Sequence, residues 1–120
     1  MSTQNTAWPQ ELVFKRAPRV LAIRFESGEK YDIPFELLRA ESPSAEERGH
    51  GPEKRTVGGK RTVGIERAEP VGRYAVRIVF DDGHDTGLYS WEYLRTLGLQ
   101  RDALMGAYLK RLKDAGLTRG

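Results

Sequence analysis

Two stretches of this chain repeat the same order of structural signals, and that repetition restricts the folds it can adopt. Residues 25–28 read Phe-Glu-Ser-Gly and residues 80–83, 55 positions further on, read Phe-Asp-Asp-Gly. A Leu-Arg pair at 38–39 recurs at 94–95. In both stretches a strand-like segment leads to an acidic turn with a glycine, a second strand and a short helix. The sequence therefore predicts a pseudo-duplicated hairpin–helix unit.

The strand predictions rest on the alternation of side chains. From residue 74 to 80 the large apolar side chains at even positions point one way, which is the pattern of a half-buried strand. Pro34 and Ser90 suit the starts of two short helices, and Gly98 and Gly116 suit the ends of the last two helices. Further strands are expected at 11–14, 19–25, 30–33, 64–70 and 86–89, and helices at 35–39, 91–97 and 101–115.

A single hairpin cannot bury its apolar face, whereas two hairpins packed together with a final helix can. At 120 residues the chain has the size of one domain. We therefore predict an α+β fold, one small domain of antiparallel β-hairpins with helices on one side and a C-terminal helix. We expect a flexible arm at 1–10, the domain proper at 11–98 with a mobile loop at 40–64, and a C-terminal helix and tail at 99–120.

Composition excludes several classes of protein. The chain has no cysteine, so it has no disulfide framework, thiol nucleophile or thiolate-ligated metal centre. Its polar N-terminus and lack of a long apolar run argue against a signal peptide and a membrane span, which makes a cytoplasmic protein the expectation. The net charge is only +3, and the basic residues are not interleaved with aromatic ones, so the composition favours a solvated surface over a nucleic-acid interface.

Residues 81–91 carry the densest group of functional side chains. Three carboxylates, a histidine, a phenol and an indole lie around one tight turn, a common position for binding residues. His84 beside Asp85 could titrate near neutral pH, bind a metal, or form local hydrogen bonds only, and one histidine with carboxylates is a poor transition-metal site. Tyr89 and Trp91 fit either the core or a partner-binding surface. The candidate contact residues are Arg39, Asp82, His84, Asp85, Tyr89, Trp91 and Arg95.

The sequence contains no complete catalytic motif. Ser90 is better placed as a helix cap than as a nucleophile, and no Gly-x-Ser-x-Gly turn occurs. The Gly-Gly-Lys at 58–60 lacks the spacing of a phosphate-binding P-loop. We therefore predict a non-enzymatic module that binds a protein partner around His84. The alternative is a metal or small-molecule site centred on His84, and a spare sheet edge would allow a homodimer.

Two segments resemble a known family. Residues 74–95, YAVRIVFDDGHDTGLYSWEYLR, resemble the signature of the gamma-butyrobetaine hydroxylase N-terminal-like domain, whose stand-alone bacterial members have no known function. Residues 33–39, IPFELLR, with the Ser-Pro-Ser at 42–44, resemble the first hairpin and helix of the same family, and the resemblance covers residues 11–98. In full-length carnitine-pathway hydroxylases this domain precedes an iron- and 2-oxoglutarate-binding catalytic domain. That domain is absent from these 120 residues, so the resemblance implies no hydroxylase activity.

The resemblance also implies a zinc position and a class of partner. In the hydroxylases the domain holds a structural zinc through three cysteines and one histidine. His84 matches the histidine, Ser42 and Ser44 lie about where two cysteines would be, and Glu47 lies near the third. A hydroxyl is a far poorer zinc ligand than a thiolate, so we expect no cofactor. The domain is also similar to one appended to chloroplast Mrp-type P-loop proteins that carry iron–sulfur clusters, which implies by analogy a partner of that type.

Overall fold

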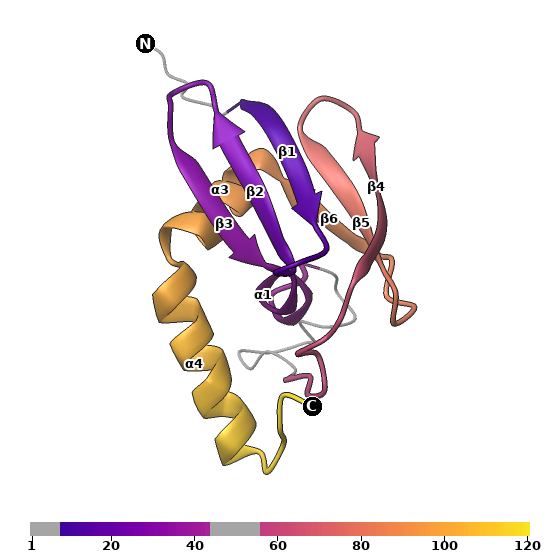
Figure 1. Cartoon of the computed structure of the whole chain (residues 1–120), viewed down its shortest axis with the longest axis vertical. Coiled ribbons are helices and arrows are strands. Elements are labelled where there is room, and N and C mark those ends of the chain that lie inside the picture. Colours follow the sequence, from indigo (N-terminus) through magenta and orange to yellow (C-terminus); the bar gives the residue numbers. More distant parts are fainter. Residues whose placement is uncertain (1–7, 44–55) are drawn as a thin grey trace.

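Two three-stranded antiparallel sheets form the scaffold of the protein (Figure 1). The structure, a computed structural model, describes residues 8–43 and 56–120. One sheet contains β1 (Pro9–Lys15), β2 (Val20–Phe25) and β3 (Lys30–Pro34), and the other contains β4 (Ile65–Val71), β5 (Ala75–Phe80) and β6 (Gly87–Ser90). Helix α1 (Phe35–Ala40) follows the first sheet, and α3 (Trp91–Leu99) and α4 (Arg101–Asp114) follow the second. The predicted α+β class is confirmed.

The predicted duplication is present in the backbone as well as in the order of elements. The β2–β3 and β5–β6 turns share one hydrogen bond, since the N–H of Phe25 donates to the carbonyl of Glu29 and the N–H of Phe80 to that of His84, each at 2.9 Å. The glycines of the two turns have φ angles of 95° and 93°. In each sheet the register of the outer strand slips near the partner of that phenylalanine. The chain therefore consists of two β-β-β-α repeats followed by α4.

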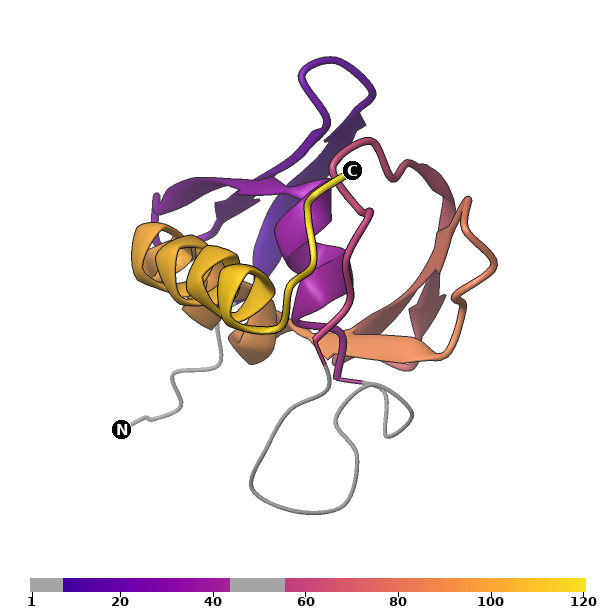
Figure 2. The same cartoon turned by 90° about the horizontal axis from the view of Figure 1, so that it is seen from below.

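The two repeats share one apolar core. The inner faces of both sheets meet α1 and α3, and Figure 2 shows α1 between the sheets with α4 along one side. Burial of one such side chain stabilises the fold by about 1.5–3 kcal/mol, more than an exposed ion pair does, so this core holds the repeats together. Its buried members are Leu21, Ile23, Phe25, Ile33, Phe35, Leu37, Leu38, Val63, Val76, Ile78, Phe80, Tyr89, Leu94 and Leu97.

The C-terminal tail holds the second part of the loop predicted at 40–64. The N–H groups of Gly59 and Arg61 donate to the carbonyls of Thr118 and Arg119 at 2.9 and 2.8 Å. Val63 is buried in the core. Gly59, Arg61 and Val63 thus have tertiary partners that their glycine-rich surroundings do not indicate, because the tail supplies hydrogen bonds that no local pattern reveals. Residues 44–55 of the predicted loop, and 1–7 of the predicted arm, lie outside the described residues.

Two further details differ from the sequence predictions. Gly98 does not end its helix but lies inside α3, where the helix packs against Tyr31. Tyr74 is 64% exposed because it belongs to the β4–β5 turn rather than to the inward-facing side of β5. Ser90 caps α3 as predicted, with its hydroxyl oxygen accepting the N–H of Tyr93 at 3.0 Å. In the part of the chain that is described, no helix is long and apolar enough to cross a bilayer.

Candidate functional site

A cluster of charged side chains surrounds Asp82 in the β5–β6 turn. One carboxylate oxygen accepts the backbone N–H of His84 at 3.0 Å, and the other is bonded to Arg39 Nε at 2.8 Å and lies 2.7 Å from Lys60 Nζ. Arg39 comes from α1 and Lys60 from the segment held by the C-terminal tail. Burial alone would raise the pKa of Asp82, but the bonds from Lys60, the His84 N–H and Arg39 lower it to about 2. Asp82 is therefore a fixed negative charge near neutral pH.

His84 turns inward from the same turn. Its side chain is buried, its Nε2 lies 2.9 Å from Ser42 Oγ, and its ring lies 6.1 Å from that of Phe80. Gly87 makes this approach possible, because a Cβ at that position would lie 2.7 Å from Ser42 Oγ and 3.0 Å from the ring of Tyr89. The Ser42–His84 hydrogen bond therefore joins the segment after α1 to the β5–β6 turn.

The equivalent end of the first repeat has a different set of side chains. Glu29 forms two hydrogen bonds with the guanidinium of Arg95 in α3, at 2.7 and 2.8 Å. The bonds from Arg95 lower the pKa of Glu29 to about 2, although burial opposes them. Tyr31 lies against Gly98, where an added Cβ would overlap the tyrosine Cγ. The β2–β3 end therefore consists of the Glu29–Arg95 ion pair and the ring of Tyr31 packed on Gly98.

The structure brings three of the seven sequence-predicted residues together and places two of the others elsewhere. Arg39, Asp82 and His84 form the cluster described above. Asp85, although it follows His84, lies on the outer side, where Arg77 Nη1 donates to its carbonyl at 2.8 Å. Arg95 belongs to the other end of the molecule, with Glu29. Spacing along the chain did not reveal this separation.

The two predicted aromatic residues have different environments. Tyr89 is fully buried and its hydroxyl donates to the carbonyl of Leu38, so it belongs to the core and cannot touch a partner directly. Trp91 is half-buried, and its Nε1 donates to the carbonyl of Arg73 at 2.7 Å on the far side of β6 from His84. For Tyr89 the core alternative therefore applies, because the strand turns this ring between the sheet and α1.

Sequence reasoning missed Lys60 as a member of the cluster. It lies in a glycine-rich stretch with no periodic pattern, and its ion pair with Asp82 depends on the tail that holds residues 59 and 61. Ser42 was considered only as a counterpart of a family cysteine. A partial signal exists, since the Leu-Arg pairs at 38–39 and 94–95 align the two halves so that Ser42, just after α1, corresponds to Gly98 in α3.

The described residues of this site do not form a hydrolytic triad. Ser42 Oγ and His84 Nε2 are within hydrogen-bond distance, but Ser42 is only 1% exposed. The carboxylate of Asp82 binds the backbone N–H of His84 and not its ring. A serine nucleophile needs an open approach for substrate and a histidine oriented through its second nitrogen, so this geometry gives no support to acyl transfer.

The described residues also do not fit the zinc site that the resemblance implies. Among residues 8–43 and 56–120, no group of three or more histidine, cysteine, aspartate or glutamate side chains could hold a metal ion. Two ligands of a tetrahedral zinc are separated by roughly 3.3 Å, whereas the Ser42–His84 distance of 2.9 Å is that of a direct hydrogen bond. Ser44 and Glu47 lie outside the described residues. A metal or small-molecule site at His84 stays a prediction.

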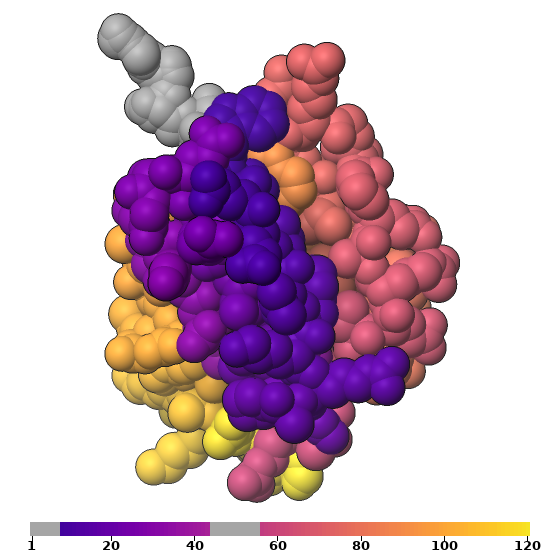
Figure 3. All heavy atoms as spheres, turned by 45° about the horizontal axis from the view of Figure 1, so that its top comes forward, coloured from indigo at the N-terminus to yellow at the C-terminus, as the bar shows by residue number. Residues whose placement is uncertain are grey.

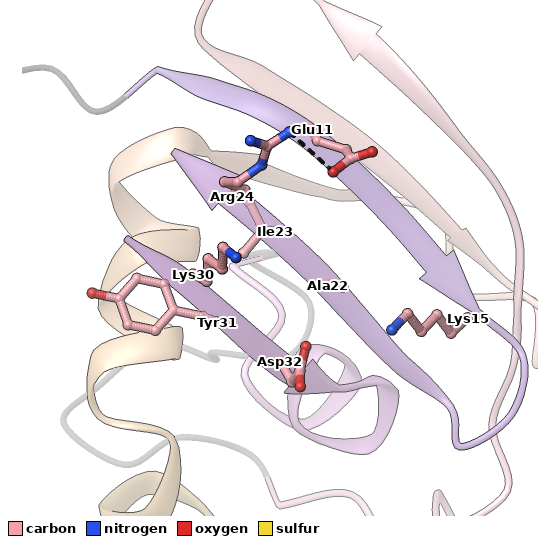
Figure 4. A pocket seen from close by; sticks show the side chains of 8 residues that line it. All are labelled: Glu11, Lys15, Ala22, Ile23, Arg24, Lys30, Tyr31 and Asp32. Carbon is pink, nitrogen blue, oxygen red and sulfur yellow. Dashed lines mark hydrogen bonds and ion pairs between the residues drawn. The ribbon is translucent and has the colours of Figure 1, made fainter. Parts of the chain in front are cut away.

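A separate hollow of about 360 Å³ lies on the outer face of the first sheet, away from His84 (Figure 4). Charged side chains of both signs surround the small Ala22 at its centre, and Arg24 pairs with Glu11 at 3.4 Å. This mixture of exposed charges is typical of a solvated sheet face. The lining residues are Glu11, Lys15, Ala22, Ile23, Arg24, Lys30, Tyr31 and Asp32.

Comparison with known proteins connects this geometry with a family. The model of the family described as gamma-butyrobetaine hydroxylase-like, N-terminal, matches residues 12–95. One NMR solution structure is 46% identical, with a TM-score of 0.84 over 99% of this chain and 90% of that chain. A second is 41% identical, with a TM-score of 0.82 over 96% of this chain and 91% of that chain.

A crystal structure from Acidithiobacillus ferrooxidans is also similar. It is of a protein with unknown function that belongs to the DUF971 family, is 38% identical, and has a TM-score of 0.64 over 75% of this chain and 91% of that chain. No curated protein matches the sequence. Because the family model covers well over half of the residues, the chain belongs to the gamma-butyrobetaine hydroxylase-like N-terminal family.

Proposed function

We propose that this protein is a non-catalytic module that binds a protein partner at the β5–β6 turn. The observation that carries the proposal is the convergence on Asp82 of Arg39 from α1 and Lys60 from the segment after residue 55. Three parts of the chain that are distant in sequence are fixed together at one exposed turn. Loops held by a rigid scaffold are frequent binding sites because their geometry needs no reordering on association.

The outer side of this turn and of β6 provides a contact surface, which we call the turn face and define as Arg77, Asp85 and Leu88. The Leu88 side chain is 48% exposed on β6, and the Asp85 side chain is 53% exposed. An apolar residue surrounded by charges of both signs is the arrangement of an interface with an apolar centre and a polar rim. We propose that the partner supplies an apolar side chain against Leu88 and a basic group near Asp85.

The partner that we propose is an Mrp-type P-loop iron–sulfur carrier protein. The support is an analogy, since a domain of this type is appended to such carriers in chloroplasts, and a module that is fused to a protein in one lineage can act as a separate subunit in another. A non-catalytic role agrees with the match of this chain to the N-terminal domain of the hydroxylase family alone.

Direct titration of the purified carrier with this protein, followed by calorimetry, tests the proposal. Leu88→Ser and Asp85→Ala should each weaken binding about tenfold, which corresponds to about 1.4 kcal/mol. The matched control is Val13→Ser, which removes an apolar side chain of similar exposure, 41%, from the other sheet and should leave the affinity within about twofold. These are surface changes, so the fold should persist.

The outcomes separate the two parts of the proposal. Absence of binding to the carrier would refute the link to iron–sulfur proteins. Binding that Leu88→Ser and Val13→Ser weaken equally would refute the turn face as the contact surface while leaving the partner in place.

A further inference from the structure

A cleft of about 370 Å³ lies between the two repeats, apart from the contact residues of the turn face. The β1–β2 turn forms one wall and residues 62–66, which lead into β4, form the other. In Figure 3 the indigo end of the first repeat reaches across to the rose-coloured part of the second. The half-buried Ile65 adds an apolar surface. Clefts between structural units are frequent sites for small ligands.

The backbone of Arg19, at the edge of this cleft, favours a residue other than arginine. Its φ of 68° makes it the one described non-glycine residue with a positive φ. Its carbonyl accepts the N–H of Phe35 at 2.9 Å, which fixes the conformation. Glycine adopts this left-handed region without steric cost and asparagine adopts it readily, whereas a longer side chain is strained there. The backbone therefore gives no reason for an arginine at this position.

The side chain of Arg19 gives a reason. It is exposed and lines the cleft together with Arg16, and within the described part of the chain neither guanidinium has an ion-pair or hydrogen-bond partner. Two positive groups thus face the same space. The two carboxylates of the cleft, Asp81 and Glu66, form no ion pair with either guanidinium in the described part of the chain, and Asp81 accepts the N–H of Gly64 at 3.0 Å on the opposite wall.

We propose that this cleft binds the phosphate group of a small molecule through Arg16 and Arg19. A guanidinium donates pairs of parallel hydrogen bonds that match the spacing of phosphate oxygens, and two guanidiniums balance the charge of a phosphate dianion. The hydroxyl of Thr62, which also lines the cleft, can donate a further hydrogen bond. Ile65, which is half-buried at the cleft, provides apolar surface for the body of an organic phosphate.

Titrations of the ¹⁵N-labelled protein with inorganic phosphate and with phenyl phosphate, at constant ionic strength, test the proposal. We expect amide shifts confined to residues 16–19 and 62–66. Arg16→Ala, Arg19→Gly and Arg19→Asn should each weaken phosphate binding about tenfold, whereas Arg24→Ala, which removes an exposed guanidinium from the other face of the sheet, should change it less than about twofold. Arg19→Gly should leave the melting temperature unchanged or raise it, because the left-handed strain disappears.

Opposite effects on binding and on stability distinguish a ligand-binding arginine from a structural one. Tighter binding of phenyl phosphate than of inorganic phosphate would identify an organic phosphate as the ligand, and equal binding would identify free phosphate. The proposal is overturned if neither probe shifts these residues, if Arg24→Ala weakens binding as much as Arg16→Ala, or if Arg19→Gly and Arg19→Asn lower the melting temperature without changing the affinity.

Discussion

The β2–β3 turn and the β5–β6 turn have the same backbone and different chemistry. In register, Tyr31 pairs with Ile23 as Gly87 pairs with Ile78, so the tyrosine and the glycine are equivalent. Each faces a residue of the other repeat: Tyr31 faces Gly98 in α3, and Gly87 faces Ser42, which lies just after α1 at the corresponding position of the sequence. At the β2–β3 turn, which we call the first end, the large Tyr31 packs on Gly98. At the β5–β6 turn, the second end, Gly87 and Ser42 are both small, and His84 bonds to Ser42 there.

The ion pairs at the two ends also have the same backbone positions and different surroundings. Arg39 and Arg95 are equivalent helix residues, and each reaches to the turn of the other repeat, where it binds Asp82 and Glu29 respectively. The Arg39–Asp82 side chains are 8% and 18% exposed, whereas those of Arg95–Glu29 are 41% and 31% exposed. His84 occupies the position equivalent to Glu29 and bonds to Ser42 instead of to an arginine. The two repeats therefore share a scaffold, and different side chains at the β5–β6 end form its polar cluster.

Truncation of the paired core leucines should have the largest effect on stability and tests whether the repeats contribute equally. Leu38 and Leu94 are equivalent and both are 0% exposed. Leu38→Ala and Leu94→Ala should each cost about 2–5 kcal/mol of unfolding free energy, because each leaves a cavity in the shared core. Urea unfolding of the two variants measures this. A loss for only one of them would show that the core is not shared between the repeats.

Gly98→Ala should have the next largest effect and tests the packing at the first end. The new Cβ would lie 2.6 Å from the Cβ of Tyr31, which cannot move without its strand. We expect a loss of about 1–3 kcal/mol, as for overpacking elsewhere. Gly106→Ala in α4 is the matched control, since nothing lies within 4 Å of its Cβ, and higher helix propensity should stabilise it by about 0.5–1 kcal/mol. Equal effects would contradict the role of Tyr31.

Asp82→Asn should destabilise the protein more than Glu29→Gln and tests the difference between the ion pairs. Asp82→Asn removes the negative charge from the ion pair with the largely buried guanidinium of Arg39, at a cost of about 1–3 kcal/mol. The Glu29 pair is more exposed and salt screens it further. Unfolding free energies at low and high salt measure both effects. The comparison fails if Glu29→Gln has the larger cost at low salt.

The pH dependence of stability should show the smallest effect. The pKa of Asp82 and that of Glu29 both lie at about 2, below the usual range of carboxylates. The unfolded chain therefore binds protons first, so the stabilisation is fully present above about pH 5 and is lost as the pH falls towards 2. Unfolding measured from pH 5 to pH 2 should show a shallower decline in Asp82→Asn than in the wild type. Identical slopes would contradict the lowered pKa of Asp82.

Local patterns accounted for the fold but for little of the candidate site. Alternation located the strands, and an acidic residue with a glycine located both turns, because these signals lie within a few residues of one another. Asp82 and His84 could be named from the same turn. Lys60 could not, because its place depends on the backbone bonds that residues 59 and 61 make with 118 and 119. Tyr89 could not be assigned to core or surface, because period-two alternation gives a face without saying what covers it.

The sequence by itself determined the elements, their order and the duplication of the hairpin–helix unit, since backbone preference and side-chain period act over short distances. The tertiary structure alone decided that Ser42 meets His84 and that Arg39 meets Asp82, across separations of 42 and 43 residues. Those contacts exist because the apolar faces of two repeats pack crosswise into one core, which brings each helix to the turn of the other repeat. Side-chain identity then decided how the two ends differ, because the lack of a Cβ at Gly87 leaves room for the Ser42 hydroxyl that bonds to His84.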